Sequence, residues 1–579
     1  MESFFPVLLL TTAIGLALLF SVQLYDSVVR HASVGLLVRL AVGIGATVII
    51  SYTVTGITTL AEPPRSSWII FWGVATGALG GHRLLFRELF RAYVRSSGEK
   101  RVLVYGAGEA GKQLAEALKL DDVHHIVAFL DDDQTLQGCR VQDLRVHDPA
   151  ITPALVDELS IDAVLLAMPS VSRSRRADII RRLESLPIEV LVIPGLSELA
   201  SGDCSVTNIR KVNIEDILVR DSVVPDPALL SSSVEGRSVL ITGAGGSIGS
   251  ELCRQILGFG PKRLVLYERS EYALYQITSE LKNAGFERDI VPILGDVMNR
   301  GHMDSVLKEY DTDVVYHAAA YKHVPLVECN VIEGVRNNTL GTLHAAQAAL
   351  SAGVERFVLI STDKAVRPTN AMGASKRLAE LVLQALAEEN HQTCFSMVRF
   401  GNVLGSSGSV VPLFRKQIQE GGPVTVTHPD VTRYFMTIPE AVSLVLQSAS
   451  MAEGGDVFLL DMGEPVKIAD LAKRLIRLSG LEVQDQEHPH GDIPIEFIGL
   501  RPGEKLFEEL LLSEEDRSTA HPRIRKAFEA VVSWSLLSSE LHHLRMALDR
   551  RDEQTVLRVL SAFVDGYEPA GIREEVRVA

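Results

Sequence analysis

Side chains that can move protons are concentrated between residues 361 and 376, STDKAVRPTNAMGASK. A hydroxyl, a carboxylate and an ammonium follow one another there, in Thr362, Asp363 and Lys364. Groups of these kinds act as general acids and bases when a hydroxyl, or a carbon next to a carbonyl, reacts. The segment therefore predicts a catalytic site that works by proton transfer.

A methionine stands where such a site often has a tyrosine. Met372 precedes Lys376 by four residues, which is the spacing of the Tyr-x-x-x-Lys site of short-chain dehydrogenases/reductases. On a helix these two residues are one turn apart and share a face. Because a thioether can neither take nor give a proton, the chemistry is either lost or carried by other residues. Lys376 could also be a solvated helix lysine, but the neighbouring cluster favours a functional role.

Strands and helices in alternation must position these side chains. RFVLIS, residues 356–361, predicts a strand that ends at the Thr-Asp-Lys cluster, and NAMGASKRLAELVLQAL, residues 370–386, predicts the helix after it. In open α/β sheets, ligands bind at the carboxyl ends of the strands. The cluster is therefore expected at the ligand-binding edge of a parallel sheet.

A dinucleotide-binding turn is predicted upstream, in RSVLITGAGGSIGSELCRQI, residues 237–256. A strand leads into the T-G-x-x-G-x-x-G spacing of short-chain dehydrogenases, and the helix that follows would direct its N-terminus at a phosphate. Glu268, at the next strand end, would accept from the adenosine ribose and favours NAD, whereas Arg269 would favour a 2′-phosphate and keeps NADP possible. The predicted cofactor-binding residues are Gly243, Gly246, Ser247, Ile248, Gly249, Glu268, Arg269, Asp296, Val297, Ala318, Ala319, Ala320, Asn338 and Lys376.

A second glycine-rich turn lies nearer the N-terminus, in RVLVYGAGEAGKQLAEAL, residues 101–118. Its glycines, Gly106, Gly108 and Gly111, follow an apolar run and open a helical pattern. A lone motif of this kind is weak evidence of binding, because the same spacing can pack a helix on a sheet without any nucleotide. No catalytic constellation follows it.

The length and composition predict several domains. A chain of 579 residues is too long for one core. We expect transmembrane helices over residues 1–95, a Rossmann-like domain that could be regulatory over 96–228, and a catalytic domain with a C-terminal substrate-binding part over 229–579. The Pro- and Ser-rich stretch at 223–236 is expected to be a connection. The predicted class is thus α/β, with two doubly wound parallel sheets after the membrane helices.

Charge and cysteine content exclude some functions. The net charge of −16 argues against a nucleic-acid partner. The five cysteines are scattered without a C-x-x-C pair, which indicates a reduced compartment and no metal site.

Three apolar runs near the N-terminus predict about three membrane spans. They cover residues 4–25, 40–60 and 66–86, the last of them past a histidine and an arginine. A signal peptide is the alternative for the first run, but the run lacks a basic start and a cleavage site. Basic residues cluster between Arg83 and Arg101, so the rest of the chain is expected in the cytoplasm, with the N-terminus outside.

Several motifs together resemble one family. They are TGAGGSIGSEL, HAAAYKHVPL, NNTLGT, STDKAVRPTNAMGASKR, RFGNVLGSSGSV, TRYFMTI and RPGEKLFEEL. They are similar to those of the membrane-bound nucleotide-sugar 4,6-dehydratases of bacterial polysaccharide and glycan synthesis, extended short-chain dehydrogenases/reductases that act on UDP-N-acetylglucosamine. The large members of that family also have Met in place of Tyr. They usually have four spans, one more than the sequence shows here.

The resemblance implies a reaction and residues for it. Oxidation at sugar C4 acidifies C5, water is lost across C5 and C6, and the stored hydride returns to C6. Thr362 would polarise the C4 oxygen, Asp363 would be the acid at C6, and Lys364 would be the base at C5, with a pKa lowered by burial and by Lys376. Lys376 would bind the nicotinamide ribose.

The resemblance also implies a substrate site, an inner-membrane location and a homo-oligomer. Asn402 and Arg501 would meet the diphosphate and Glu504 the uridine ribose. Arg433 may join the diphosphate site, although Arg433 and Glu504 could instead form a surface ion pair. Lys322 and His323 could touch the sugar. These residues make up the predicted substrate site, and no metal is expected.

Two other functions stay open on the same residues. An epimerase or oxidoreductase could use this scaffold, although a C4 epimerase needs the tyrosine that Met372 replaces. A non-catalytic nucleotide-sugar sensor would explain Met372 and the first glycine turn.

Overall fold

The computed structural model describes residues 5–21, 34–58, 63–95, 100–119, 123–169, 171, 173–184, 186, 188–193, 210–212, 225–286, 289–389, 392–406, 408–486, 488–509 and 516–569. The chain divides into two compact units. The first consists of Met1–Pro169 with Ile193–Ile209, and the second of Ser170–Val192 with Arg210–Ala579.

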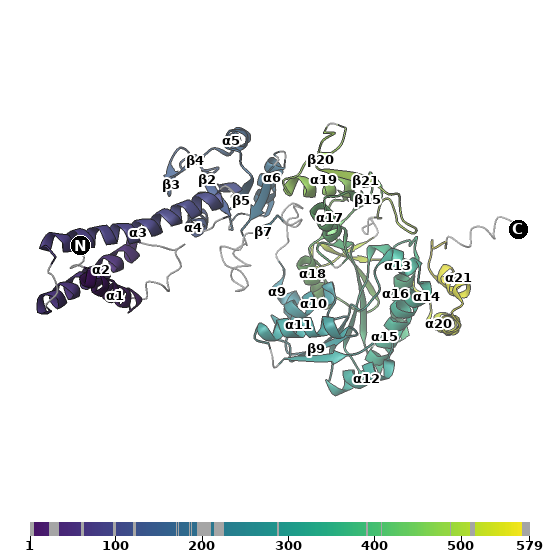
Figure 1. Ribbon diagram of the computed structural model, residues 1–579. Helices are drawn as coiled ribbons and strands as arrows, with labels where there is room; N and C mark the ends of the chain where they lie inside the picture. The colour runs from purple at the N-terminus through teal and green to yellow at the C-terminus, as the bar shows by residue number, and fades with distance from the viewer. Residues whose placement is uncertain are drawn as a thin grey trace. The chain divides into compact units, whose positions relative to one another are not determined.

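The first unit begins with three helices (Figure 1), α1 (Phe5–Ser21), α2 (Val34–Ile57) and α3 (Arg65–Arg95). Small residues let them pack closely: the Nε1 of Trp72 on α3 donates to the backbone oxygen of Ala41 on α2 at 2.9 Å. Among the described residues, one stretch, Leu40–Ile57, is long and apolar enough to cross a membrane. The structure therefore supports one of the three predicted spans. The side chains of the basic residues on the second half of α3 lie outside the described part.

A parallel sheet follows in the same unit. Its strands stand in the order β3-β4-β2-β1-β5, and β1 pairs in parallel with β2 and with β5. The elements are β1 (Lys100–Tyr105), α4 (Glu109–Leu118), β2 (His124–Leu130), β3 (Arg140–Val141), β4 (Leu144–His147), η3 (Pro149–Ile151), α5 (Thr152–Leu159) and β5 (Ala163–Leu166). The predicted Rossmann-like strand–turn–helix is confirmed here.

The second unit is built on a nine-stranded sheet in the order β10-β9-β8-β11-β12-β13-β18-β23-β22. The strands from β10 to β18 are parallel, and β23 and β22 are antiparallel additions. Their bounds are β8 (Ser238–Thr242), β9 (Arg263–Glu268), β10 (Ile290–Leu294), β11 (Val314–His317), β12 (Arg356–Ile360), β13 (Cys394–Arg399), β18 (Asp456–Leu460), β22 (Arg517–Ser518) and β23 (Ile524–Ala527).

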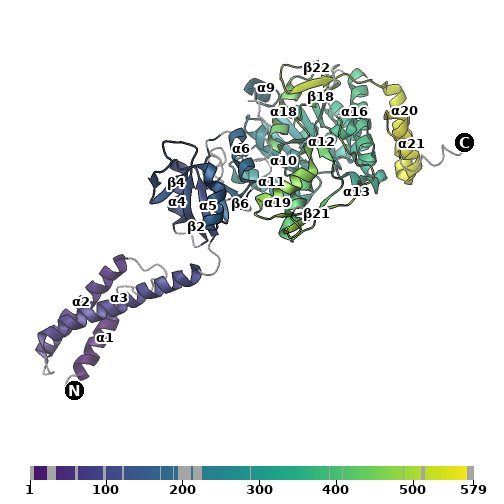
Figure 2. The same cartoon turned by 90° about the horizontal axis from the view of Figure 1, so that it is seen from above.

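Helices cover both faces of this sheet, which explains why its central strands are apolar on both sides. On β12, Phe357 and Leu359 face one core and Val358 faces the other. One face is covered by α12 (Arg300–Glu309), α15 (Gly341–Ala352) and α16 (Ala371–Glu389), and the other by α9 (Pro227–Ser232), α10 (Ser247–Leu257), α11 (Glu271–Asn283) and α18 (Ile438–Ser450). The C-terminal helices α20 (Trp534–Arg550) and α21 (Glu553–Phe563) pack on α16 (Figure 2). The predicted α/β class is confirmed.

Smaller elements complete the second unit around the ligand edge of the sheet. Short helices α13 (Val324–Glu328), α14 (Val331–Val335), η4 (Arg336–Leu340) and η5 (Asp363–Ala365) lie between the strands. The remaining elements are α6 (Arg173–Leu183), β6 (Glu189–Val192), β7 (Arg210–Lys211), β14 (Asn402–Val403), α17 (Val410–Gln419), β15 (Val424–Val426), β16 (Thr432–Arg433), β17 (Phe435–Met436), β19 (Val466–Lys467), α19 (Ile468–Leu478), β20 (Val483–Gln484) and β21 (Ile493–Phe497).

The stretch at 225–236, expected to be part of a connection, contains helix α9 over Pro227–Ser232. The Asp226 carboxylate caps it by accepting from the Ala228 backbone N–H at 2.9 Å. Leu230 is buried, and α9 packs on α18. One apolar side chain and a cap at the right position therefore outweigh a Pro- and Ser-rich composition.

Candidate active site

The turn between β8 and α10 brings two backbone segments into contact. Gly243 has a φ of +65°, and a Cβ there would lie 2.9 Å from the backbone of Ala319. A Cβ on Gly249 would lie 2.0 Å from the Gly243 carbonyl oxygen. Glycine is therefore required at both places. The small Ala318 and Ala319 let the β11 end approach the turn.

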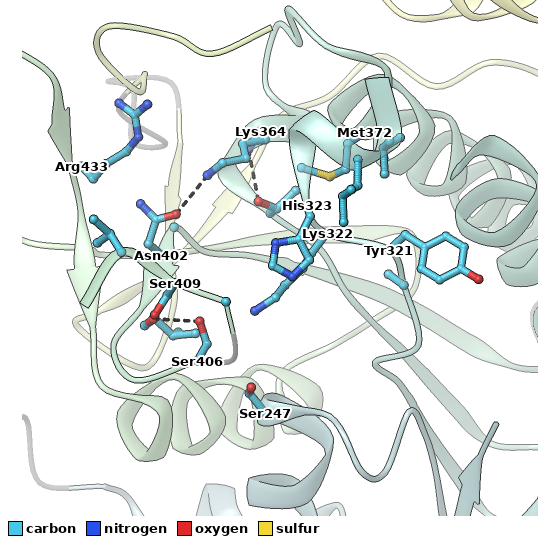
Figure 3. A pocket seen from close by; sticks show the side chains of 18 of the residues that line it. Ser247, Tyr321, Lys322, His323, Lys364, Met372, Asn402, Ser406, Ser409 and Arg433 are labelled. Carbon is cyan, nitrogen blue, oxygen red and sulfur yellow. Dashed lines mark hydrogen bonds between the residues drawn. The ribbon is translucent and has the colours of Figure 1, made fainter. Parts of the chain in front are cut away.

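A cavity of about 890 Å³ opens at the carboxyl edge of the sheet, between this turn and helix α16. Figure 3 shows Ser247 at the start of α10, across the cavity from Lys364 and Met372. The predicted site residues on its wall are Gly246, Ser247, Ile248, Gly249, Ala318, Ala320, Lys322, His323, Thr362, Lys364, Met372, Lys376, Asn402, Arg433, Arg501 and Glu504. The predicted cofactor turn, catalytic cluster and substrate residues thus share one cavity.

The Thr-Asp-Lys cluster is joined by hydrogen bonds. Thr362 Oγ1 donates to Asp363 Oδ1 at 2.8 Å, and Lys364 Nζ donates to the same oxygen at 3.0 Å. Lys364 Nζ also donates to Asn402 Oδ1 at 3.2 Å (Figure 3). Asp363 is buried, behind Lys364 rather than on the cavity wall. A hydroxyl, a carboxylate and an ammonium within hydrogen-bond distance can pass a proton among themselves.

The expected electrostatics of Lys364 are wrong. Burial lowers the pKa of its ammonium, but the carboxylates of Asp363 and Glu508 raise it by more, so the pKa lies above its usual value. Lys376 does not act on it as predicted. A lysine between two carboxylates holds its proton, and Lys364 is therefore an ammonium in this arrangement.

Lys376 is the lysine whose pKa falls. Burial lowers it to about 8, against an opposing effect of Glu380. Its Nζ donates to the Ile360 backbone oxygen at 2.7 Å, which anchors the side chain at the end of β12. Met372, one turn earlier on α16, is buried and lines the cavity. The pair shares a helix face, as the four-residue spacing predicts.

A buried ionic network behind the cluster was not predicted. Glu380, one turn beyond Lys376, accepts from Ser361 Oγ at 2.6 Å and from Arg399 Nε at 2.9 Å. Arg399 and Arg377 also pair with Glu529, which precedes α20. Burial opposes the Glu380 charge, but Arg399 lowers the pKa of that carboxyl to about 2. The network ties α16, β12 and β13 together directly beneath the catalytic cluster.

Several predicted cofactor residues do not line the cavity. They are Gly243, Glu268, Arg269, Asp296, Val297, Ala319 and Asn338. The Glu268 carboxylate accepts from the backbone N–H groups of Gly245 at 3.0 Å and Ser270 at 2.9 Å, and so shapes the turn. The Asn338 side chain bonds both backbone groups of Tyr321, at 2.8 and 3.0 Å. Asn338 is thus placed to support the wall rather than to form it.

Arg269 is occupied by protein partners. One guanidinium nitrogen donates to the Tyr321 hydroxyl at 2.6 Å, and the guanidinium lies over the Tyr321 ring. Another is 3.7 Å from Asp296. These contacts turn Arg269 away from the role that would favour a 2′-phosphate.

The predicted substrate residues form an ionic cluster. Arg433 donates to Glu504 Oε1 at 3.1 Å, and Glu504 Oε2 accepts from the Arg501 backbone N–H at 3.2 Å. The ion pair of the alternative interpretation therefore forms, but it is largely buried, with the Arg433 side chain 11% and the Glu504 side chain 23% exposed. Lys322 and His323 reach the cavity, and burial lowers the pKa of both.

The turn and cavity fit a dinucleotide. Gly246 lies at the turn where a phosphate would approach, and Ser247 opens an eleven-residue helix. Glu268 stands at the strand end where an adenosine ribose would bind. Lys376 is placed at the other end, at the cavity wall.

Comparisons with known proteins give a consistent family. A family model described as "Polysaccharide biosynthesis protein" matches residues 239–529, and one described as "CoA-binding domain" matches residues 22–194. The chain is 44% identical to the capsular polysaccharide biosynthesis protein CapD of Staphylococcus aureus, over 86% of this chain and 83% of that protein.

Two further relatives match about half of the chain. A UDP-N-acetylglucosamine 4,6-dehydratase (inverting) of Campylobacter jejuni is 33% identical over 49% of this chain and 80% of its own length. A UDP-glucose 4-epimerase of Rickettsia rickettsii is 35% identical over 48% and 79%. Relatives with two different reactions therefore share this scaffold.

Proposed function

The chain belongs to the polysaccharide biosynthesis protein family, and from this premise we propose that it is a hydro-lyase that converts UDP-N-acetylglucosamine to a UDP-4-keto-6-deoxy-N-acetylhexosamine. The observation that carries the proposal is the hydrogen-bonded Thr362-Asp363-Lys364 cluster at the cavity. A dehydration needs an acid and a base side by side, whereas a C4 epimerisation does not use such a pair.

The cofactor is NAD. The backbone of the glycine turn binds its phosphates, Glu268 binds the adenosine ribose, and Lys376 binds the nicotinamide ribose. When bound there, NAD would supply the acceptor for the hydride at C4 and the donor of the hydride at C6. The contacts of Arg269 with Tyr321 and Asp296 support NAD over NADP. The predicted chemistry of the remaining steps belongs to this chain's own side chains.

Asp363 changes protonation during the reaction. Its Oδ1 accepts from Thr362 Oγ1, so a proton leaving the C4 hydroxyl can pass through the Thr362 hydroxyl to the carboxylate. The protonated Asp363 is then the acid for the departing C6 hydroxyl, and its proton reaches the sugar through the Thr362 hydroxyl, which lines the cavity. The carboxylate is restored when water leaves, so the proton is conserved.

Lys364 becomes a better base at the stage where a base is needed. In the resting cluster, Asp363 helps to raise the pKa of the Lys364 ammonium. Once Asp363 carries the C4 proton, that contribution is lost, and the ammonium releases its proton to water more readily. The neutral amine takes the C5 proton, returns one to C5 after the water has left, and then recovers from water the proton it released, which restores the ammonium.

The nucleotide is held opposite these groups. Arg501 and Arg433 bind the diphosphate with Asn402, and Glu504 binds the uridine ribose. The N-terminal helices anchor the enzyme in a bacterial inner membrane with the catalytic unit in the cytoplasm, and the basic cluster between Arg83 and Arg101 supports this orientation. The first Rossmann-like domain is regulatory, and the enzyme is a homo-oligomer.

Mass spectrometry of UDP-N-acetylglucosamine after incubation with full-length protein and NAD tests the function. Loss of one water is expected. An isomer of unchanged mass would instead make the chain an epimerase, as the Rickettsia relative is named. An unchanged sugar would leave the sensor hypothesis.

A further inference from the structure

A carboxylate that the sequence did not single out lies against Lys364. Glu508 Oε1 is 3.4 Å from Lys364 Nζ and 3.5 Å from Arg433 Nε. The Glu508 side chain is 4% exposed, so solvent does little to weaken these contacts. Glu508 thus connects a proposed catalytic residue with a proposed nucleotide-binding residue.

The position of Glu508 complements that of Asp363. Lys364 Nζ donates one hydrogen bond to Asp363 and forms an ion pair with Glu508. It donates a further hydrogen bond to the Asn402 side-chain oxygen. The charged groups that act on the ammonium are therefore Asp363, Glu508 and, with the opposite effect, Arg433. Of the two carboxylates, only Asp363 has a role in the proposed proton transfers.

Glu508 can hold Lys364 at the stage when Asp363 loses its charge. Asp363 becomes neutral once it holds the C4 proton, and its attraction for Lys364 then weakens. A long flexible ammonium held only by the Asn402 side-chain oxygen would leave its place near C5. The Glu508 carboxylate also faces Arg433, at 3.5 Å, and takes no part in the proton transfers, so it keeps the Lys364 ammonium in position until that ammonium releases its proton.

We propose that Glu508 is a positioning residue for Lys364, which it holds at the cavity while Asp363 is protonated. The catalytic consequence rests on the proposed function, whereas the electrostatic coupling of Glu508 to Lys364 does not. The two can therefore be tested separately.

The coupling is tested by competitive acylation of full-length protein with acetic anhydride across alkaline pH. Mass spectrometry of the Lys364 peptide gives the pH at which that amine becomes reactive. Glu508→Gln keeps the shape but removes a charge within 4 Å, so the midpoint should fall by about one pH unit. Glu508→Asp keeps the charge and should return the midpoint toward the wild-type value.

Glu509→Gln is the matched control. The Glu509 carboxylate pairs with Lys505 and Arg367 and not with Lys364, so this variant should label like wild type. Equal Lys364 midpoints in wild type and Glu508→Gln would overturn the proposal. A Lys364 midpoint in Glu508→Asp that is shifted as far as in Glu508→Gln would also overturn it, because the carboxylate charge would then not be the cause.

Solvent deuterium incorporation at C5 of UDP-N-acetylglucosamine tests the catalytic consequence. In Glu508→Gln the pH of half-maximal deuterium incorporation should fall together with the labelling midpoint, because the neutral Lys364 amine is present at lower pH. The maximal rate of incorporation should drop at least tenfold, whereas KM should change little. If the labelling midpoint shifts but the wild type forms no keto product, the proposed function is wrong and the coupling of Glu508 to Lys364 stands. If the keto product forms but the midpoint does not shift, the coupling is wrong and the proposed function stands.

Discussion

The two glycine-rich turns use the same backbone device. A Cβ on Gly111 of the first would lie 1.9 Å from the Gly106 carbonyl oxygen, and one on Gly249 of the second would lie 2.0 Å from that of Gly243. In each turn a carboxylate from the next strand end accepts a backbone N–H. Asp131 accepts from Ala107 at 2.7 Å, as Glu268 accepts from Gly245 at 3.0 Å.

The surroundings of the two turns differ. Helix α4 begins with Glu109, an exposed acid in the first turn, whereas α10 begins with Ser247 at the cavity wall. A negative charge at a helix N-terminus opposes a phosphate, which such a terminus otherwise attracts. The spacing of glycines therefore predicts how a helix packs on a sheet, and the residues around the turn decide what it can bind.

The largest expected effect is a loss of turnover when Asp363 or Lys364 in the second unit is substituted. Asp363→Asn keeps the shape but removes the acid, so turnover should fall by roughly 10²–10⁴-fold, the usual contribution of a general acid or base. Lys364→Met should lose as much, together with deuterium incorporation at C5. The measurement is keto-sugar formation under saturating UDP-N-acetylglucosamine.

The control for this prediction is Asp131→Asn in the first unit. Asp131 shapes its turn but lies on no catalytic cluster, so turnover should stay near wild type. A comparable loss in both variants would mean that the first turn also serves the chemistry.

The sequence could predict whatever depends on neighbours along the chain. The strand–turn–helix at Gly243, the strand end at Glu268 and the helix face shared by Met372 and Lys376 are all local patterns, and the structure confirms them. Asp363 and Lys364 were predicted as a pair because they are adjacent.

Contacts made by folding could not be predicted in the same way. The carboxylates of Asp363 and Glu508 raise the pKa of Lys364 against the effect of burial, and Glu508 approaches from a segment far along the chain. Glu380 resembles any helix carboxylate in sequence, and its burial against Arg399 appears only once α16 packs on β13. A charged residue one turn after Lys376 was the available signal, and it does not reveal its partner.

A smaller effect should appear in the pH dependence of stability. The pKa of Lys376 is about 8 in the folded protein, below its unfolded value near 10.4, so the unfolded state binds more protons between these two pH values. The contribution of Lys376 to the free energy of unfolding therefore rises with pH across this window, by about 1.4 kcal/mol per pH unit. Urea unfolding at several pH values should show a shallower rise in Lys376→Met.

Lys112→Met provides the comparison from the first unit. Lys112 is exposed on α4, so its removal should leave the slope unchanged. A shallower slope in this variant too would show that the pH dependence does not report the buried lysine.

The glycines themselves give a third contrast. Gly249→Ala and Gly111→Ala both place a methyl group against a carbonyl oxygen, which should destabilise each unit by about 1–3 kcal/mol. NAD affinity, measured by calorimetry, should be lost in Gly249→Ala and kept in Gly111→Ala. Equal weakening by the two substitutions would contradict the division of roles between the turns.

The smallest effect is expected at Met372, the residue that replaces the usual tyrosine. Its side chain is 3% exposed and belongs to the core between α16 and the sheet, while it also lines the cavity. An apolar group there keeps water from the sugar and the nicotinamide, and a leucine would do the same. Met372→Leu conserves volume and should therefore cost less than about 1.5 kcal/mol in stability, with turnover within a few-fold of wild type. If Met372→Leu is inactive while Asp363→Asn retains full turnover, the proton-transfer role does not lie in the Thr362-Asp363-Lys364 cluster. The two glycine-rich turns would then differ only in whether they bind a nucleotide.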